Sequence, residues 1–448
     1  MPLTGIEIFK LLPKTNCGEC GVPTCLAFAM GLAAGKAELA ACPYVSDEAK
    51  ARLEEASAPP IRLVTIGVGE RAIKVGGETV MFRHEKRFEN PPGFAILISD
   101  TMAQAEIDSR LDRCQKLQYE RVGLTLRPEL VALKCDSQDA AKFEALVARA
   151  KQNSGCNIIL MSESPDILAA GLKVCADGKP LLYAATRDNL DQVATLAKDS
   201  SCPVAVKAGS LDELCELTTK LTQSGINDLV IDSGSRSLRQ ALADQVAVRR
   251  AALVNKFRPL GFPTIVLANE MSDDPMKEAL IAATFVAKYG GIIVLSDFQG
   301  ESLFPLLVLR MNIFTDPQRP LATTEGIYEI GGPGEDSPVL LTSNFSLTYF
   351  IVSSEIENSR IPGFLLVKDT EGLSVMTAWA AGKFVADTIA PLIKKCGIAD
   401  KVKHRKLIIP GYIAAESGGL EEELPGWEIL VGPREGAHIP AYLKAWRP

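Results

Sequence analysis

Four of the eleven cysteines stand close together near the N-terminus, with the spacing C-x2-C-x4-C-x16-C. They are Cys17, Cys20, Cys25 and Cys42. Three thiolates in a nine-residue loop can hold three corners of a metal cluster, and a fourth that returns after a helical segment closes the cage. Four cysteine thiolates are the ligand set of a [4Fe–4S] cluster. Gly18 and Gly21 suit such a site, because a residue without Cβ lets the backbone wrap closely around the cluster.

Two alternatives to the cluster remain at this stage. Structural zinc sites usually present two C-x2–4-C pairs, and here the second pair is missing. The thiols could also be inert. The other seven cysteines are scattered singly, mostly in apolar surroundings, which predicts small buried side chains without pairing in a reducing cytoplasm. They are Cys114, Cys135, Cys156, Cys175, Cys202, Cys215 and Cys396.

The bulk properties of the chain exclude several classes of protein. A length of 448 residues predicts two or three domains. The net charge of −7 argues against nucleic acid as a partner, since its binding requires a basic face. No stretch reaches the roughly 18 uninterrupted apolar residues of a membrane span. The N-terminus also lacks the basic-then-apolar pattern of a signal peptide. We therefore expect a soluble, cytoplasmic protein without a membrane partner.

Three domains are predicted along the chain. Residues 1–58 form the cysteine module, and Pro59 and Pro60 mark its end. In residues 59–324, β-branched apolar runs alternate with helical segments, a pattern typical of parallel strands buried on both faces. The runs are 94–100, 130–136, 157–162, 180–185, 203–208, 228–233, 263–268 and 291–297. Eight such units favour a (β/α)8 TIM barrel, preceded by a hairpin in residues 61–92. A large open doubly wound sheet is the alternative.

Residues 325–448 predict a third domain of the α/β class. Its strands are expected at 337–343, 363–369, 405–411 and 427–433, and a long helix is expected from Ser374. Parallel strands with helices on both faces indicate a doubly wound, Rossmann-like sheet. Such sheets bind ligands beyond the carboxyl ends of their strands, and here those ends are small, polar and rich in glycine. A large ligand lying over the sheet edge would need such loops.

The sequence resembles a known family over its whole length and in the same domain order. The resemblance rests on "NCGECGVPTC…CP" and, more specifically, on "DTEGLSVMTAW" and "GWEILVGPRE". These segments are similar to the large (gamma) subunit of the corrinoid iron–sulfur protein of the acetyl-CoA (Wood–Ljungdahl) pathway. The resemblance implies a methyl-transfer system component that has no catalytic residue of its own. It also implies a cobalamin-type corrinoid, whose cobalt accepts a methyl group from methyltetrahydrofolate through a methyltransferase and passes it to acetyl-CoA synthase.

The same resemblance implies a small subunit as heterodimer partner, a corrinoid in the C-terminal domain and a barrel that serves as scaffold. It also implies that the [4Fe–4S] cluster takes electrons from a low-potential donor and returns Co(II) to Co(I). By position, the corrinoid contacts are expected in the strand-end loops. They are Thr342, Asn344, Ser346, Thr348, Thr370, Glu371, Gly372, Leu373, Ser374, Gly411, Gly432 and Pro433. Ser374 could equally be a plain helix N-cap.

A missing histidine gives an independent chemical argument. Many cobalamin-dependent methyltransferases supply an axial histidine from a D-x-H-x-x-G motif, whereas Glu371 stands at that position here. Co(I), with eight d electrons, repels axial donors, so a cobalt without histidine or its own nucleotide base is easier to reduce. We therefore expect a base-off corrinoid. One competing hypothesis is a ferredoxin-like electron-transfer subunit of a larger redox complex, which explains the cysteines but gives the C-terminal domain no role. Another is a barrel methyltransferase that acts directly on a pterin, with the cluster in a structural role.

Overall fold

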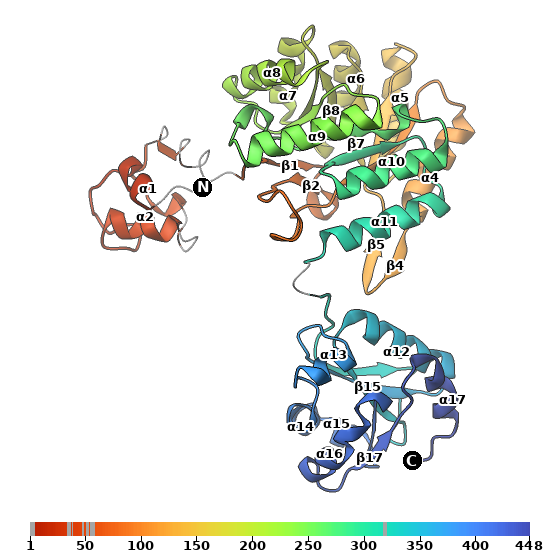
Figure 1. Cartoon of the computed structure of the whole chain (residues 1–448). Helices are drawn as coiled ribbons and strands as arrows, with labels where there is room; N and C mark the ends of the chain where they lie inside the picture. The colour runs from red at the N-terminus through yellow and green to blue at the C-terminus, as the bar shows by residue number, and fades with distance from the viewer. Residues whose placement is uncertain are drawn as a thin grey trace. The chain divides into compact units, whose positions relative to one another are not determined.

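The computed structural model describes residues 5–33, 37, 39–46, 49–50, 53, 59–316 and 320–448 (Figure 1). The N-terminal cysteine module contains α1 (Gly5–Leu11), α2 (Cys25–Ala33) and a 3-10 turn (Leu39–Ala41). Its small core includes Ile8, Phe28 and two of the cysteines, Cys25 and Cys42. Thus the cysteine side chains are themselves part of the packing that holds the module together.

Eight parallel strands form the central barrel. They are β3 (Gly93–Ser99), β6 (Leu130–Lys134), β7 (Asn157–Met161), β8 (Leu181–Ala185), β9 (Val204–Lys207), β10 (Leu229–Asp232), β11 (Ile265–Leu267) and β12 (Ile292–Leu295). They follow one another around the sheet in chain order. Between β10 and β11 the ring closes through a parallel bridge of Ile231 with Thr264 and a 2.9 Å bond from Ile231 N to Pro263 O. The predicted TIM-barrel-like fold is confirmed, and the open sheet is excluded.

Helices alternate with these strands and surround the barrel (Figure 1). They are α4 (Gln104–Lys116), α5 (Ala140–Asn153), α6 (Pro165–Cys175), α7 (Leu190–Ser200), α8 (Leu211–Gln223), α9 (Leu238–Leu253), α10 (Pro275–Ala287) and α11 (Gly300–Phe314). Several begin at a side chain that caps free backbone amides, as helix N-termini require. Asp139 caps α5, Ser210 caps α8 and Asp274 caps α10. Short polar residues therefore fix where each helix starts.

A hairpin closes one end of the barrel. Its strands, β1 (Leu63–Ile66) and β2 (Ile73–Gly76), are antiparallel, as predicted. Val64, Ile66 and Val75 are buried in the same core as the inward side chains of the barrel strands. Gly67 N bonds to Lys179 O, in the connection that leads into β8. The hairpin therefore covers the amino-terminal end of the barrel, which leaves the carboxyl-end loops open to the other side.

The C-terminal sheet has the order β13-β15-β14-β16-β17. Its strands are β13 (Gly326–Ile330), β14 (Val339–Ser343), β15 (Gly363–Lys368), β16 (Lys406–Ile409) and β17 (Glu428–Val431). The four predicted strands are parallel, and the edge strand β13, which the sequence did not predict, runs antiparallel to β15. The helices are α12 (Ser346–Ser359), α13 (Val375–Ala380), α14 (Ala386–Lys395), α15 (Ile398–Lys401), α16 (Ser417–Glu423) and α17 (Ile439–Lys444).

Both faces of this sheet are covered. Leu341 and Leu366 pack in one cluster with α13, α14 and α16, whereas Leu340 and Leu365 pack on the other face with α12 and α17. The single long helix expected from Ser374 is wrong. It is two helices, α13 and α14, separated around Gly382, whose φ of +69° no helix can continue.

The chain divides into two compact units. The first comprises residues 1–81, 89–116 and 128–306, and the second residues 82–88, 117–127 and 307–448. The second therefore includes a hairpin that the sequence did not predict, β4 (Tyr119–Arg121) with β5 (Leu124–Leu126). The domain boundaries expected at 58 and 324 stay predictions.

We predict that Ile66→Ala destabilises the barrel by roughly 2–5 kcal/mol, because it opens a cavity under the hairpin where Ile66 is fully buried. Urea unfolding followed by circular dichroism measures this change. Leu63→Ala is the matched control on the same strand, where the side chain is 42% exposed, and it should cost about 1 kcal/mol or less. Equal effects of the two substitutions would contradict the packing described here.

Candidate cofactor sites

The four predicted cluster ligands all lie on the N-terminal module. Cys25 and Cys42 are buried, Cys20 is half-buried and Cys17 is exposed. Asn16 fastens the start of the loop to α2, since its Oδ1 accepts a bond of 2.8 Å from Cys25 N while its own N donates to Cys25 Sγ at 3.4 Å. An amide aimed at a sulfur is a contact that tunes iron–sulfur clusters.

Backbone geometry lets the loop between the cysteines turn tightly. Gly18 and Gly21 have φ of +76° and +82°, which favours glycine. Tyr44 lies beside the loop and donates a 2.8 Å bond to Glu19 Oε1. The pKa of Tyr44 is raised, mainly by this bond and the charge of Glu19, and further by Cys17 and Cys42.

The assignment of the four cysteines to one cluster stays a prediction. Among the residues that the structure describes, no three Cys, His, Asp or Glu side chains are gathered closely enough to hold a metal ion. The donor set nevertheless suits an iron–sulfur cluster, because four thiols share one short module and no carboxylate or imidazole competes in the C-x2-C-x4-C loop except Glu19, which is bonded to Tyr44.

A cavity of about 240 Å³ opens in the C-terminal domain at the carboxyl ends of β14, β16 and β17. It lies where the order of the parallel strands reverses, between β14 and β16, which is where ligands bind open α/β sheets. Most of its wall is apolar, including Leu340, Ile351, Ile408 and Ile439. The predicted contact residues that line it are Thr342, Thr348, Ser374, Gly432 and Pro433.

Two hydroxyl groups at the end of β14 are buried without a hydrogen-bond partner among the described residues. They belong to Thr342, which is 1% exposed and lines the cavity, and to Ser343. An unsatisfied buried polar group costs about 1–3 kcal/mol, so such groups require an explanation. A ligand that brings a polar atom to Thr342 Oγ1 would remove this cost. The cavity thus has the feature expected of a binding site.

Asn344 does not line the cavity but organises the loop after β15. Its Oδ1 accepts bonds from Thr370 N, Thr370 Oγ1 and Gly372 N at 2.9–3.0 Å, and its Nδ2 donates to Asp369 Oδ1 at 2.8 Å. The side chain of Glu371, at the position of the absent histidine, pairs with Lys383 at 2.5 Å. This loop is therefore held in shape by contacts within the protein.

The predicted contact residues outside the cavity lining are Asn344, Ser346, Thr370, Glu371, Gly372, Leu373 and Gly411. The sequence also missed residues that do line it, notably Tyr412 and Arg434. Arg434 directly follows the predicted pair Gly432 and Pro433, and no carboxylate pairs with it in the described part of the chain. In the sequence, the position of Arg434 next to Gly432 and Pro433 was the one signal that could have indicated a cavity residue. Gly411 has a structural reason to be glycine, since a Cβ there would lie 2.6 Å from Gly432 O.

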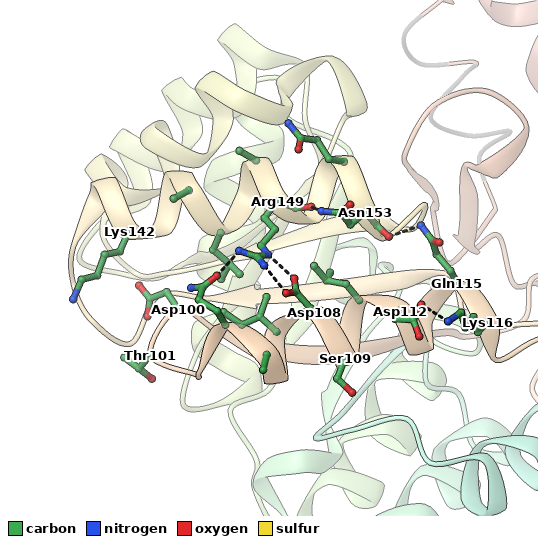
Figure 2. A pocket seen from close by; sticks show the side chains of 18 residues that line it. Asp100, Thr101, Asp108, Ser109, Asp112, Gln115, Lys116, Lys142, Arg149 and Asn153 are labelled. Atoms are coloured by element: carbon green, nitrogen blue, oxygen red, sulfur yellow. Dashed lines mark hydrogen bonds and ion pairs between the residues drawn. The ribbon is translucent and has the colours of Figure 1, made fainter.

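A second, larger hollow lies outside the barrel, between α4 and α5 (Figure 2). Its volume is about 1430 Å³, and its lining is mostly polar. Figure 2 shows Arg149 of α5 reaching across to α4, where it bonds Asp108 at 2.5 and 2.6 Å. Lys116 pairs with Asp112 within α4 at 2.9 Å. Because these charges already satisfy one another, we do not assign a cofactor to this groove.

The expectation that all seven scattered cysteines are unpaired is wrong for two of them. Cys114 and Cys156 are joined by a disulfide, which their separation of 42 residues concealed in the sequence. The other five are free and buried or half-buried, as expected. Burial raises the pKa of Cys175 to about 12, which makes this thiol unreactive. In the described ranges, no helix combines the length and apolar character that crossing a membrane requires.

Comparisons with known proteins match the whole chain. A family model for the CO dehydrogenase/acetyl-CoA synthase delta subunit covers residues 63–443, and one for an Fe–S cluster covers residues 12–44. The corrinoid/iron-sulfur protein large subunit of Moorella thermoacetica is 46% identical over 99% of both chains. The acetyl-CoA decarbonylase/synthase complex subunit gamma of Methanopyrus kandleri is 36% identical, over 99% of this chain and 97% of that one. The subunit of the same name from Methanothermobacter thermautotrophicus is 35% identical over 99% of both.

We predict that Asn344→Ala loosens the loop after β15, because the amides of Thr370 and Gly372 lose their acceptor. Hydrogen–deuterium exchange of these two amides should accelerate about tenfold, the equivalent of one hydrogen bond. Thr348→Ala, on the cavity wall, should leave their exchange unchanged. Unaltered protection in Asn344→Ala would show that the loop does not depend on this side chain.

Proposed function

The chain belongs to the family of the corrinoid/iron-sulfur protein large subunit, and we propose that it is the methyl-carrying subunit of a methyltransferase system. When bound, a cobalamin-type corrinoid supplies a cobalt that accepts a methyl group from methyltetrahydrofolate, through a separate methyltransferase, and passes it to acetyl-CoA synthase. The observation that carries this proposal is the cavity beside the unpartnered hydroxyl of Thr342, in a chain whose relative is named for a corrinoid.

The C-terminal domain is the proposed corrinoid-binding domain, with a Rossmann-like arrangement of its four parallel strands. Leu340, Ile351 and Ile408 offer apolar walls to an aromatic base of the nucleotide, and Thr342 Oγ1 offers it a polar contact. Arg434 offers a cation to the phosphate of the nucleotide loop. A nucleotide base held in this cavity would not be available to cobalt, as the proposed base-off state requires.

We propose that this chain would offer no ligand to cobalt, because of two features of the loop after β15. Glu371 stands where a histidine would be needed, and its side chain is engaged with Lys383. The loop itself is fixed by Asn344. The residues on this edge would therefore offer the metal no nitrogen ligand, which would favour Co(I).

The cysteine module is the proposed holder of a [4Fe–4S] cluster, with Cys17, Cys20, Cys25 and Cys42 as ligands. Such a cluster supplies single electrons at low potential. Asn16 and the two glycines of the loop would orient backbone amides toward the sulfurs. We propose that this module takes electrons from a low-potential donor and restores Co(I) after accidental oxidation.

The proposed partners are a small subunit that forms a heterodimer with this chain, the methyltransferase and acetyl-CoA synthase, all in the cytoplasm. Two of the relatives are named as subunits of a complex. Large apolar side chains that are 38–49% exposed also lie at or near the cavity on the C-terminal domain. They are Leu347, Ile351, Met376 and Tyr412. Clusters of this kind mark protein or ligand contacts.

We predict that Cys20→Ala impairs reductive reactivation but not methyl transfer, because it removes a proposed cluster ligand from the N-terminal module. Methyl transfer from preformed Co(I) should survive, while reductive reactivation of Co(II) should fall at least about a hundredfold, the loss expected when an obligatory electron carrier is missing. Stopped-flow spectroscopy of the corrin absorption follows both steps. Cys215→Ala, which removes a free thiol on α8, is the control. Loss of both steps in a folded variant would contradict the proposed division.

We predict that Arg434→Ala weakens binding of a complete corrinoid about tenfold, the cost of one charge-assisted hydrogen bond. A corrinoid without the nucleotide loop should bind the variant and the parent chain equally, because it has no phosphate for Arg434 to contact. Equilibrium dialysis with cobalt detection measures both affinities. Lys395→Ala, an exposed lysine on α14, is the control. If Arg434→Ala weakened the binding of both corrinoids equally, Arg434 would not contact the phosphate of the nucleotide loop, which would contradict this assignment.

A further inference from the structure

The disulfide between Cys114 and Cys156 has no role in the proposed methyl transfer. Cys114 lies in the last turn of α4 and is buried, whereas Cys156 precedes β7 and is half-buried. Their Cα atoms are 6.9 Å apart. The bond therefore ties a helix on the outside of the barrel to the beginning of a barrel strand.

Several segments of the barrel unit meet around this disulfide. Arg71, in the turn of the hairpin that covers the barrel, donates to Gly155 O at 2.6 Å, and Asn157 Nδ2 donates back to Arg71 O at 2.8 Å. Gln115, next to Cys114, bonds the backbone of Asn153 at the end of α5. The disulfide thus lies at the amino-terminal end of the barrel, the end associated with stability and not with catalysis.

Each sulfur also has a backbone acceptor within reach. Cys114 Sγ lies 3.8 Å from Leu130 O, and Cys156 Sγ lies 3.7 Å from Cys114 O. Two thiols at these positions would therefore keep weak hydrogen-bond partners after reduction. Cys156 is half-buried, whereas Cys114 is only 4% exposed. The site can therefore accommodate both oxidation states, and Cys156 is the cysteine that a small thiol reagent would reach first.

We propose that Cys114 and Cys156 form a reversible disulfide that stabilises the barrel when it is oxidised; we call this pair the redox lock. On oxidation by a small-molecule disulfide, two protein thiols form one S–S bond and the reagent leaves as two thiols, so two electrons and two protons pass to the reagent. A dithiol reductant reverses the exchange. The locked form is more stable because the bond closes a loop of 42 residues and restricts the unfolded chain. In a cytoplasm, where thiols are normally reduced, the lock closes when conditions become oxidising.

The test uses the full chain, purified without oxygen and then equilibrated with either oxidised or reduced glutathione. Free thiols are alkylated, and peptides are analysed by mass spectrometry without reduction. We expect a linked Cys114–Cys156 peptide after oxidation and two alkylated peptides after reduction. Cys175 and Cys202, both buried and free, should never appear in a linked peptide. Separate alkylation of Cys114 and Cys156 in both buffers, or linkage of either to another cysteine, would overturn the proposal.

Thermal unfolding provides the second readout. The oxidised chain should melt about 5–10 °C above the reduced chain, as expected for a disulfide in a domain of this size. This difference should vanish in Cys156→Ser, at a half-buried position. It should persist in the control Cys215→Ser, which removes a free thiol. A difference that persists in Cys156→Ser would show that the stabilisation comes from elsewhere. The iron content of the same samples shows whether a change in melting temperature arises from loss of the cluster.

Discussion

Parallel strands that are buried on both faces must bring all their carboxyl ends to one edge, and the rest of this structure depends on that constraint. The barrel and the parallel strands of the C-terminal sheet both meet this constraint, but the side chains at their carboxyl edges differ. In the barrel, Tyr183 donates to Asp232 at 2.6 Å and Arg236 pairs with the same carboxylate at 2.8 Å. In the C-terminal domain, the Thr342 hydroxyl lies beside a cavity and has no hydrogen-bond partner among the described residues. At the barrel edge Asn269 Oδ1, just after β11, is also buried without a partner in the described part of the chain. At the C-terminal edge the unpartnered hydroxyl of Thr342 adjoins a largely apolar cavity, which is why we propose a scaffold for one and a cofactor site for the other.

The proposed chemistry divides between two small sets of side chains. The cysteine module offers four thiols and amide contacts, which suit one-electron transfer. The C-terminal edge offers hydroxyls, one cation and apolar walls, which suit recognition of a large cofactor but no bond to its metal. The ion pair of Glu371 with Lys383 belongs to this second set, since Glu371 stands at the histidine position of the D-x-H-x-x-G motif. The two proposed roles complement each other, because a cobalt without a nitrogen ligand is easier to reduce and the cysteine module would supply the electrons.

Much of the fold followed from local patterns. The eight barrel strands are short runs of branched apolar residues, and such runs are buried wherever they occur. Strand β13 was missed because most of its residues are only half-buried, and the break at Gly382 was missed because an isolated glycine is tolerated within helices. The pairing of Cys114 with Cys156 depends on where α4 ends in space. Asn344 stays a predicted cofactor contact, and its four hydrogen bonds to residues 369–372 show a structural role in addition, which only three dimensions reveal.

The iron and cobalt content of the chain tests the central claim most directly. The protein should be isolated without oxygen, with corrinoid available and with its small partner subunit present. Our account predicts about four irons and close to one cobalt per chain, the content of one [4Fe–4S] cluster and one corrinoid. The same iron without cobalt would contradict it and would favour an electron-transfer subunit instead.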